Sequence, residues 1–172
     1  MNDATLIIKC INGDQRAQRA LFERFAPKML GVCLRYIKDR TQSEDVLQDG
    51  FVKVFLKIKD HKGGSLEGWI RVIMVNTALD QVRKNYKFRN NVATEEGSYK
   101  MVEKSFIVET LIAEDILGII SSMAVGYRTV FNMFAIEGYS HREIAEELGI
   151  TENTSKSQYH RAREHLKKKL KQ

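Results

Sequence analysis

The chain has 172 residues and a formal net charge of +6, with 28 lysines and arginines against 22 aspartates and glutamates. This length suffices for one or two modest hydrophobic cores, and the excess of cations favours a polyanionic partner. The two cysteines, Cys10 and Cys33, lack metal-ligand spacing, and no apolar run approaches a membrane span, so we expect a cytoplasmic protein with reduced thiols, no export, no membrane insertion, no metal and no cofactor.

Helical spacing recurs along the chain, whereas strand-like alternation is hard to find, and we therefore predict an all-α fold. Apolar side chains recur about every fourth residue over 17–36, where Pro27 marks either a kink or the first turn of a new helix. A second helix is predicted to begin near Thr41, because Thr41 and Glu44 have the spacing of a capping box. A third helix is predicted over about 66–87.

The composition predicts two small helical domains joined by a flexible acidic linker. The three helices would form the first domain over residues 1–88, the linker would cover 89–108, and the second domain would cover 109–172. Residues 89–123 hold three basic and six acidic side chains, and apolar periodicity is weak over 89–104.

Within the second domain, residues 139–166 are typical of a helix-turn-helix. Ser140 and Glu143 predict a capping box at the start of its first helix. Gly149 follows the end of that helix, where a glycine tolerates the positive φ that is needed. Thr151 is the expected N-cap of the next helix. The first turns of this second helix contain short polar and cationic side chains, which suit base edges and phosphates in a major groove.

The distribution of charge favours DNA over a merely solvated helix. Seven lysines and arginines and two glutamates occur over 151–172, a net charge of +5. Residues 124–150 have two basic and four acidic side chains, a net charge of −2. A solvated face would mix both signs, whereas here the cations concentrate on the candidate recognition helix and its exit.

Two motifs in this order make the chain resemble the extracytoplasmic-function (ECF) type of bacterial sigma factor, a minimal member of the sigma-70 family. The first motif is SEDVLQDGFVKVF at 43–55, followed by GWIRVIMVNTALDQVRK at 68–84. The second is GYRTVFNMFAIEGYSHREIAEELGITENTSKSQYHRAR at 126–163. The resemblance implies a non-enzymatic protein that binds core RNA polymerase, directs it to a class of promoters and helps to open the start region.

The resemblance also implies where the protein partners bind. The helix over 43–58 is expected to dock on the clamp helices of the largest polymerase subunit, and the flap region of polymerase is a further expected contact. The expected polymerase-binding residues are Asp45, Gln48, Asp49 and Phe51. Phe55 is instead assigned to the core. An anti-sigma factor or another protein regulator is the default expectation for control.

Opening the minus-10 element requires a base of the non-template strand to leave the stack, which is costly unless the base gains a pocket and its backbone gains cations. By the resemblance, the loop between the second and third helices and one face of the third helix meet this element. The expected minus-10 residues are His61, Lys62, Gly63, Gly64, Ser65, Arg71, Asn76, Arg83, Lys84 and Lys87. Asp80 is expected to take part in an intramolecular polar network, and Trp69 is expected to anchor the core.

The minus-35 element is expected to meet the second helix of the helix-turn-helix. The expected minus-35 residues are Arg142, Thr151, Thr154, Lys156, Ser157, His160, Arg161 and Arg163. Among these, Lys156, Ser157, His160 and Arg161 are expected to face the groove and the others to bind phosphates.

The chain departs from the common family pattern at two places. Met123 and Ala124 stand where a leucine-proline pair is usual, so the start of the following helix is expected to differ. Ser155 and Gln158 stand where an aliphatic and a basic residue are frequent, which leaves the promoter sequence open.

Two other classes of protein were weighed against this interpretation. A dimeric helix-turn-helix regulator would bind palindromic operators without core polymerase. A helical adaptor would bind only proteins, and its DNA affinity would lack the strong salt dependence that phosphate contacts produce. An enzyme is disfavoured, because the four histidines lie on loops or among cations without a recognisable nucleophile or metal cluster.

Overall fold

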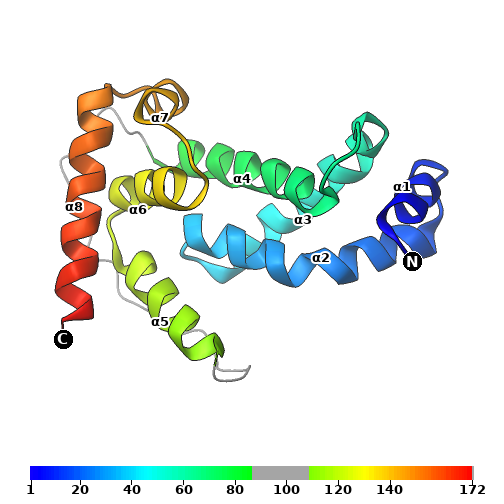
Figure 1. Cartoon of the computed structure of the whole chain (residues 1–172), viewed down its shortest axis with the longest axis horizontal. Helices are drawn as coiled ribbons and strands as arrows, with labels where there is room; N and C mark the ends of the chain where they lie inside the picture. Colours follow the sequence, from blue (N-terminus) through cyan, green and yellow to red (C-terminus); the bar gives the residue numbers. More distant parts are fainter. Residues whose placement is uncertain (87–108, 172) are drawn as a thin grey trace. The chain divides into compact units, whose positions relative to one another are not determined.

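The computed structural model describes residues 1–86 and 109–171, and it divides into two compact units, Met1–Val82 and Arg83–Gln172 (Figure 1). Every regular element in the described ranges is a helix. The predicted all-α fold with two helical domains is therefore confirmed. The expected linker over 89–108 lies outside the described residues, and so does Lys87.

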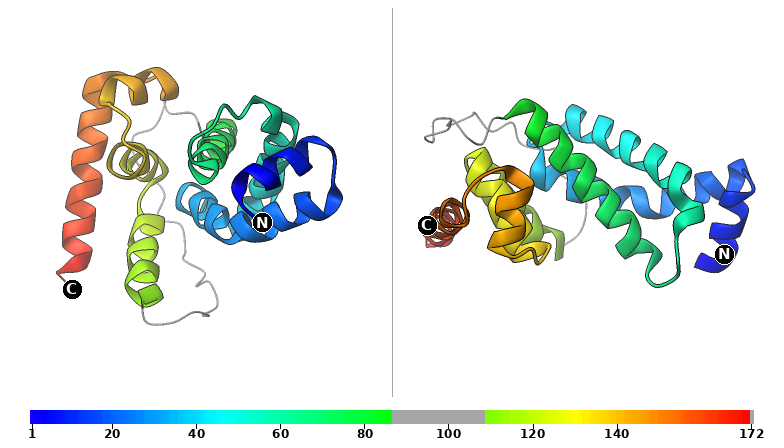
Figure 2. Two further views of the ribbon diagram at one scale, coloured as in Figure 1. Left: turned by 45° about the vertical axis from the view of Figure 1, so that its right-hand side comes forward. Right: turned by 90° about the horizontal axis from the view of Figure 1, so that it is seen from above.

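The first unit consists of four α-helices and one short 3₁₀ helix. These elements are α1 (Asp3–Ile11), α2 (Gln15–Tyr36), α3 (Arg40–Lys57), η1 (Ile58–Asp60) and α4 (Leu66–Asn85). Helix α1 packs against α2 and η1, and α2 packs along α3; Figure 2 gives two further views of them. Three helices were predicted here, and α1 is a fourth, which begins where Asn2 Oδ1 accepts a hydrogen bond of 2.9 Å from the Thr5 N–H.

Helix α2 continues through Pro27 as one element. Asp14 caps its start, since one carboxylate oxygen accepts hydrogen bonds from the N–H groups of Arg16 and Ala17. The expected apolar face is buried along its whole length, from Ala17 to Tyr36. Of the two expectations for Pro27, a new helix beginning there is therefore wrong.

The start of α3 differs from the prediction. Asp39 is the N-cap, and its side chain accepts a hydrogen bond of 2.8 Å from the Gln42 N–H. Thr41 lies inside the helix and is exposed, and Glu44 pairs with Arg40 at 2.9 Å instead of closing a capping box. A carboxylate two residues upstream has taken the role expected of the threonine hydroxyl, because both residue types accept well at an N-cap.

Residues 109–171 of the second unit form four α-helices and one π-helical turn. These elements are α5 (Glu109–Ser122), α6 (Val125–Phe131), η3 (Asn132–Ile136), α7 (His141–Leu148) and α8 (Glu152–Leu170). Helices α6 and α7 both pack against α8. All three local predictions for the helix-turn-helix are confirmed, namely the Ser140–Glu143 capping box, a left-handed Gly149 with φ of 65°, and Thr151 as N-cap.

Two contacts hold α6 in this unit. The buried Arg128 guanidinium donates a hydrogen bond of 3.0 Å to the Met123 carbonyl just beyond the end of α5, and burial lowers the pKa of Arg128 to about 10. Gly126 lies against Gln158 of α8, where an added Cβ would come within 3.0 Å of Gln158 Oε1. The Gln158 side chain therefore packs on α6, which accounts for an uncharged residue at this position.

Candidate nucleic-acid interface

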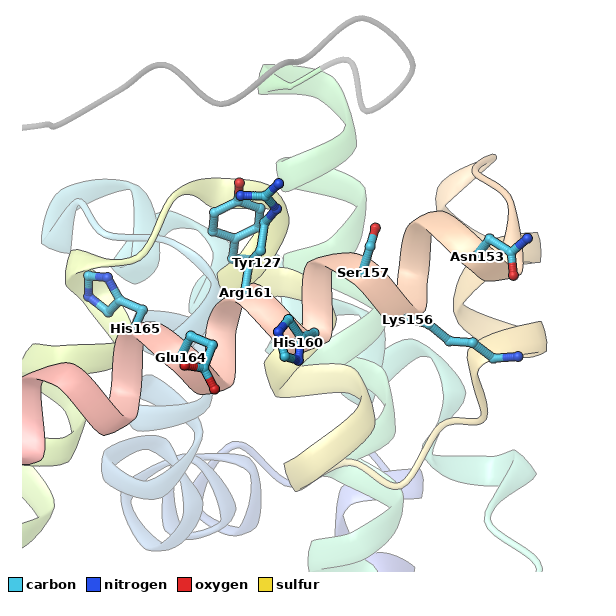
Figure 3. Close-up of a pocket in the computed structure, with 8 residues that line it drawn as sticks. All are labelled: Tyr127, Asn153, Lys156, Ser157, His160, Arg161, Glu164 and His165. Carbon is cyan, nitrogen blue, oxygen red and sulfur yellow. The ribbon is translucent and has the colours of Figure 1, made fainter.

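One face of α8 lines a hollow on the surface of the second unit (Figure 3). We call the α8 residues that line it the groove face: Asn153, Lys156, Ser157, His160, Arg161, Glu164 and His165. They recur every three or four residues, as one helical face requires. The four residues predicted to face a DNA groove all belong to this set, and all four are exposed.

Four of the residues that line the hollow are not among the predicted site residues. Asn153, Glu164 and His165 continue the same helical spacing, so periodicity alone would have found them. Tyr127 lies on α6 and reaches the hollow only because α6 packs against α8 (Figure 3). No local sequence signal connects Tyr127 with this face.

Three of the residues predicted to bind phosphates, Arg142, Thr151 and Thr154, lie at the starts of α7 and α8, whereas Arg163 lies further along α8. Thr151 Oγ1 accepts a hydrogen bond of 3.1 Å from the Thr154 N–H, and the two hydroxyls are 2.9 Å apart. Arg142 is exposed and pairs with Glu146 at 3.2 Å, while the Arg163 guanidinium lies 5.9 Å from the centre of the Tyr159 ring. The threonine hydroxyls are thus engaged in capping α8.

Two ionisable groups set the charge at the far end of the groove face. His165 Nε2 lies 2.8 Å from Ser122 Oγ of α5, and burial, followed by Lys169 and Lys168, lowers the pKa of His165. At neutral pH its imidazole is therefore uncharged. The Lys167 ammonium donates a hydrogen bond of 3.1 Å to Glu164 and holds the pKa of that carboxyl below its usual range.

The loop that precedes α4 contains the predicted minus-10 residues His61, Lys62, Gly63, Gly64 and Ser65. Lys62, Gly63 and Gly64 are exposed, and the two glycines have φ of 97° and 85°, a region that other residues rarely adopt. Ser65 Oγ accepts a hydrogen bond of 3.1 Å from the Gly68 N–H and so caps α4.

The ring of His61 packs on Trp69 rather than pointing into solvent. The two rings meet edge to face with 5.5 Å between centroids, and His61 Nε2 is inaccessible. Trp69 itself is partly buried and is packed against His61, so its expected role as a core anchor stays a prediction. The pair fixes the base of the loop against the first turn of α4.

The exposed side of α4 presents a polar face. Asn76 and Lys84 are exposed, and Arg71 and Arg83 are partly exposed. Asp80 lies 3.6 Å from Lys53 Nζ, which also donates a hydrogen bond of 3.2 Å to Thr77 Oγ1. The predicted intramolecular role of Asp80 is therefore confirmed.

The four predicted polymerase contacts on α3 do not share one environment. Asp45, Gln48 and Asp49 are exposed, whereas Phe51 is only 2% exposed. The Phe51 ring packs edge to face on Phe22, with 4.8 Å between centroids. Phe51 is therefore a core residue, and its prediction as a surface contact is wrong.

Two apolar side chains extend the exposed face of α3. Val52 is 57% exposed and Leu56 is 70% exposed, although both are aliphatic. We define the α3 outer face as the residues Asp45, Gln48, Asp49, Val52 and Leu56. Their spacing of three or four residues puts them on one side of the helix, and exposed aliphatic side chains on such a face are typical of a protein-binding surface.

Two further observations on the described residues concern membrane spans and metal sites. No helix among them is long and apolar enough to cross a membrane. Within the same ranges, no group of three or more histidine, cysteine, aspartate or glutamate side chains is arranged to hold a metal ion.

The fold and the groove face define a DNA-binding protein of the helix-turn-helix class, and comparison with known proteins identifies its family. The Sigma-70 region 2 family matches residues 21–88, and the Sigma-70 region 4 family matches residues 113–166. The chain belongs to the ECF sigma factors of the sigma-70 family, which are non-enzymatic transcription initiation factors.

Individual relatives agree with this assignment. The ECF sigma factor SigL of Mycobacterium tuberculosis is 30% identical over 149 residues, covering 84% of this chain and 83% of the relative. SigE of Mycolicibacterium smegmatis is 27% identical over 162 residues, and the match covers 90% of this chain but only 63% of that longer protein. The sigma factor RpoE of Bartonella quintana, solved with the anti-sigma factor NepR, shares the fold with a TM-score of 0.50 at 20% identity, covering 89% of this chain and 96% of RpoE.

Proposed function

We propose that this chain binds core RNA polymerase and directs it to promoters that contain a minus-35 and a minus-10 element. The observation that supports this most strongly is the groove face of α8. It combines the predicted base-reading residues on one exposed side of a fully capped helix-turn-helix, in a chain of the ECF sigma family.

The groove face suits the major groove of the minus-35 element. Lys156 and Arg161 are exposed cations that would donate hydrogen bonds to guanine O6 and N7, and Ser157 and His160 lie beside them on the same helical face. Arg142 and Arg163 would bind phosphates, together with the N–H groups at the start of α7 and α8.

The loop before α4 suits an extruded base of the minus-10 element. The exposed Gly63 and Gly64 have no side chain to keep a base away from the backbone, and Lys62 supplies a cation next to them. Asn76 on α4 would bind the base or support it, while Arg71 and Lys84 would bind phosphates and offset the cost of unstacking.

The α3 outer face suits the clamp helices of the polymerase. Its polar end, Asp45, Gln48 and Asp49, provides hydrogen-bond acceptors, and Val52 and Leu56 provide apolar area that is covered on binding. The second unit would contact the flap region, so that the polymerase holds both DNA-binding units at the spacing of the two promoter elements.

A separate protein regulator is the control that we propose. The support is the family likeness to RpoE, whose structure contains the anti-sigma factor NepR. A pulldown from unstressed cells should recover an inhibitor together with this chain. Recovery of core polymerase without any inhibitor would count against this part of the proposal.

Co-purification with core RNA polymerase, followed by run-off transcription from genomic fragments, tests the main proposal. We expect stoichiometric association and discrete new start sites that depend on this chain. A protein that does not bind core polymerase, but binds palindromic DNA by itself, would be a conventional regulator. One whose weak DNA binding is insensitive to salt would be a protein adaptor.

A further inference from the structure

His141 connects the two helices of the helix-turn-helix through a buried hydroxyl. It is the first residue of α7, and its Nδ1 lies 2.9 Å from Ser155 Oγ in the first turn of α8. Ser155 is 0% exposed. A buried hydroxyl without a partner is costly, so the contact with His141 stabilises the position of Ser155 inside the unit.

The His141 ring also stacks on a third element. It lies 4.2 Å from the Phe134 ring at an interplanar angle of 12°, and Phe134 belongs to the π-helical turn η3. Phe134 in turn lies 4.6 Å from the Tyr159 ring of α8, which is 5.8 Å from His141. One imidazole thus contacts η3 and α8 from the start of α7.

The buried site at position 155 holds a hydroxyl. An aliphatic side chain would fill such a site without needing a partner. Serine fits the site only with a polar neighbour, and His141 is that neighbour. The contact between His141 and Ser155 therefore allows α8 to pack on α7 with a serine at this buried position.

We propose that His141 is a positioning residue for minus-35 recognition, which sets the first turn of α8, and with it the groove face, relative to α7 and η3. This inference rests on the proposed minus-35 function. His141 need not touch DNA, because its effect passes through Ser155 to the next residues along the helix, Lys156 and Ser157.

The electrostatic surroundings favour the neutral ring. Burial lowers the pKa of His141, Lys156 of α8 lowers it further, and Glu152 of α8 opposes them. On α7, Glu143 is turned back to accept a hydrogen bond from the Ser140 N–H, and Arg142 pairs with Glu146. The ring also lies at the N-terminus of α7 and against the first turn of α8, and the partial positive charge of both helix ends disfavours an imidazolium.

The direction of the pH effect follows from this lowered pKa. A neutral His141 contributes its full stabilisation above the unfolded value of 6.5, and that contribution is lost as the pH falls below 6.5 toward the folded value. Minus-35 affinity should therefore weaken on mild acidification.

The test uses full-length holoenzyme and a fluorescent minus-35 duplex titrated between about pH 5.5 and 8, the range in which histidine changes charge. His141→Phe keeps a stacking ring but loses the hydrogen bond, and His141→Asn keeps a polar group near Ser155 but loses the stack. Ser155→Ala removes the hydroxyl, and His160→Gln and His165→Gln are the matched controls for the two histidines of the groove face. Core binding and melting temperature of each variant report on folding.

We expect His141→Phe to weaken minus-35 binding roughly two- to tenfold at neutral pH, the worth of one hydrogen bond. It should also abolish the acid-side loss that wild type, His160→Gln and His165→Gln retain, and the effects of His141→Phe and Ser155→Ala should not add. A His141→Phe variant with wild-type affinity and an unchanged pH profile, or fully additive losses, would overturn the inference. Failure of the wild-type holoenzyme to recognise any minus-35 element would refute the proposed function instead.

Discussion

Leu56→Ala should weaken binding to core RNA polymerase without affecting the fold. Leu56 is 70% exposed and lies at the apolar end of the α3 outer face. Fully burying a leucine side chain is worth about 1.5–3 kcal/mol, so covering this exposed fraction would contribute about 1–2 kcal/mol to binding, a roughly five- to thirtyfold change in affinity. Truncation to alanine removes most of this contribution, and alanine is a good helix former.

The assay is competition between unlabelled variants and a labelled wild-type chain for core polymerase, with run-off transcription as a second measurement. Ile8→Ala is the matched control, because Ile8 is also an aliphatic residue on a helix, is 60% exposed and belongs to α1 rather than to the α3 outer face. Equal affinities for Leu56→Ala and wild type, or an equal loss for Ile8→Ala, would refute the assignment of this face.

Three further predictions concern stability, thiol chemistry and charge. Gly50→Ala should lower the free energy of unfolding in urea by up to about 2 kcal/mol, because overlap of its Cβ with the end of the fully buried Met74 side chain costs about 1–3 kcal/mol and the helix preference of alanine offsets about 1 kcal/mol of this; a raised midpoint would contradict this packing. Burial raises the pKa of Cys33 to about 12, so a thiol reagent at mildly alkaline pH should modify Cys33 no faster than the chain unfolds, and rapid labelling of folded protein would argue against this. Glu164→Gln should tighten minus-35 binding at low salt and lose this advantage at high salt, whereas an advantage that persists at high salt would point to a contact other than phosphate attraction.

Local signals predicted the helix-turn-helix because its geometry depends on single backbone positions. A serine followed three residues later by glutamate, and a glycine at a helix end, act through their own hydrogen bonds and φ angles, as Ser140 and Gly149 do here. The capping-box spacing of Thr41 predicted the wrong start for α3, because Asp39 is the N-cap of that helix. Helix α1 was missed because its nine residues are too few for helical spacing to be told from a short apolar run.

The candidate site was predictable wherever one helix presents it. The groove face follows from the spacing of residues on α8, but Tyr127 joins it only through tertiary packing. Phe51 could have been separated from its polar neighbours by periodicity, since it continues the buried series of Leu47, Val54 and Ile58. Motif resemblance instead grouped it with exposed residues, and the contact with Phe22 of α2 shows which element buries it.

The α3 outer face is small, and its two aliphatic side chains belong to adjacent turns of one helix. If this face binds polymerase as we propose, any protein that covers Val52 and Leu56 would exclude polymerase by competition alone, without altering the fold or touching a proposed DNA-binding residue. The free fraction of the chain would then follow the concentration of the competitor relative to its dissociation constant. Degrading a competitor of this kind would release the sigma factor in proportion, so that the response to a signal would be graded.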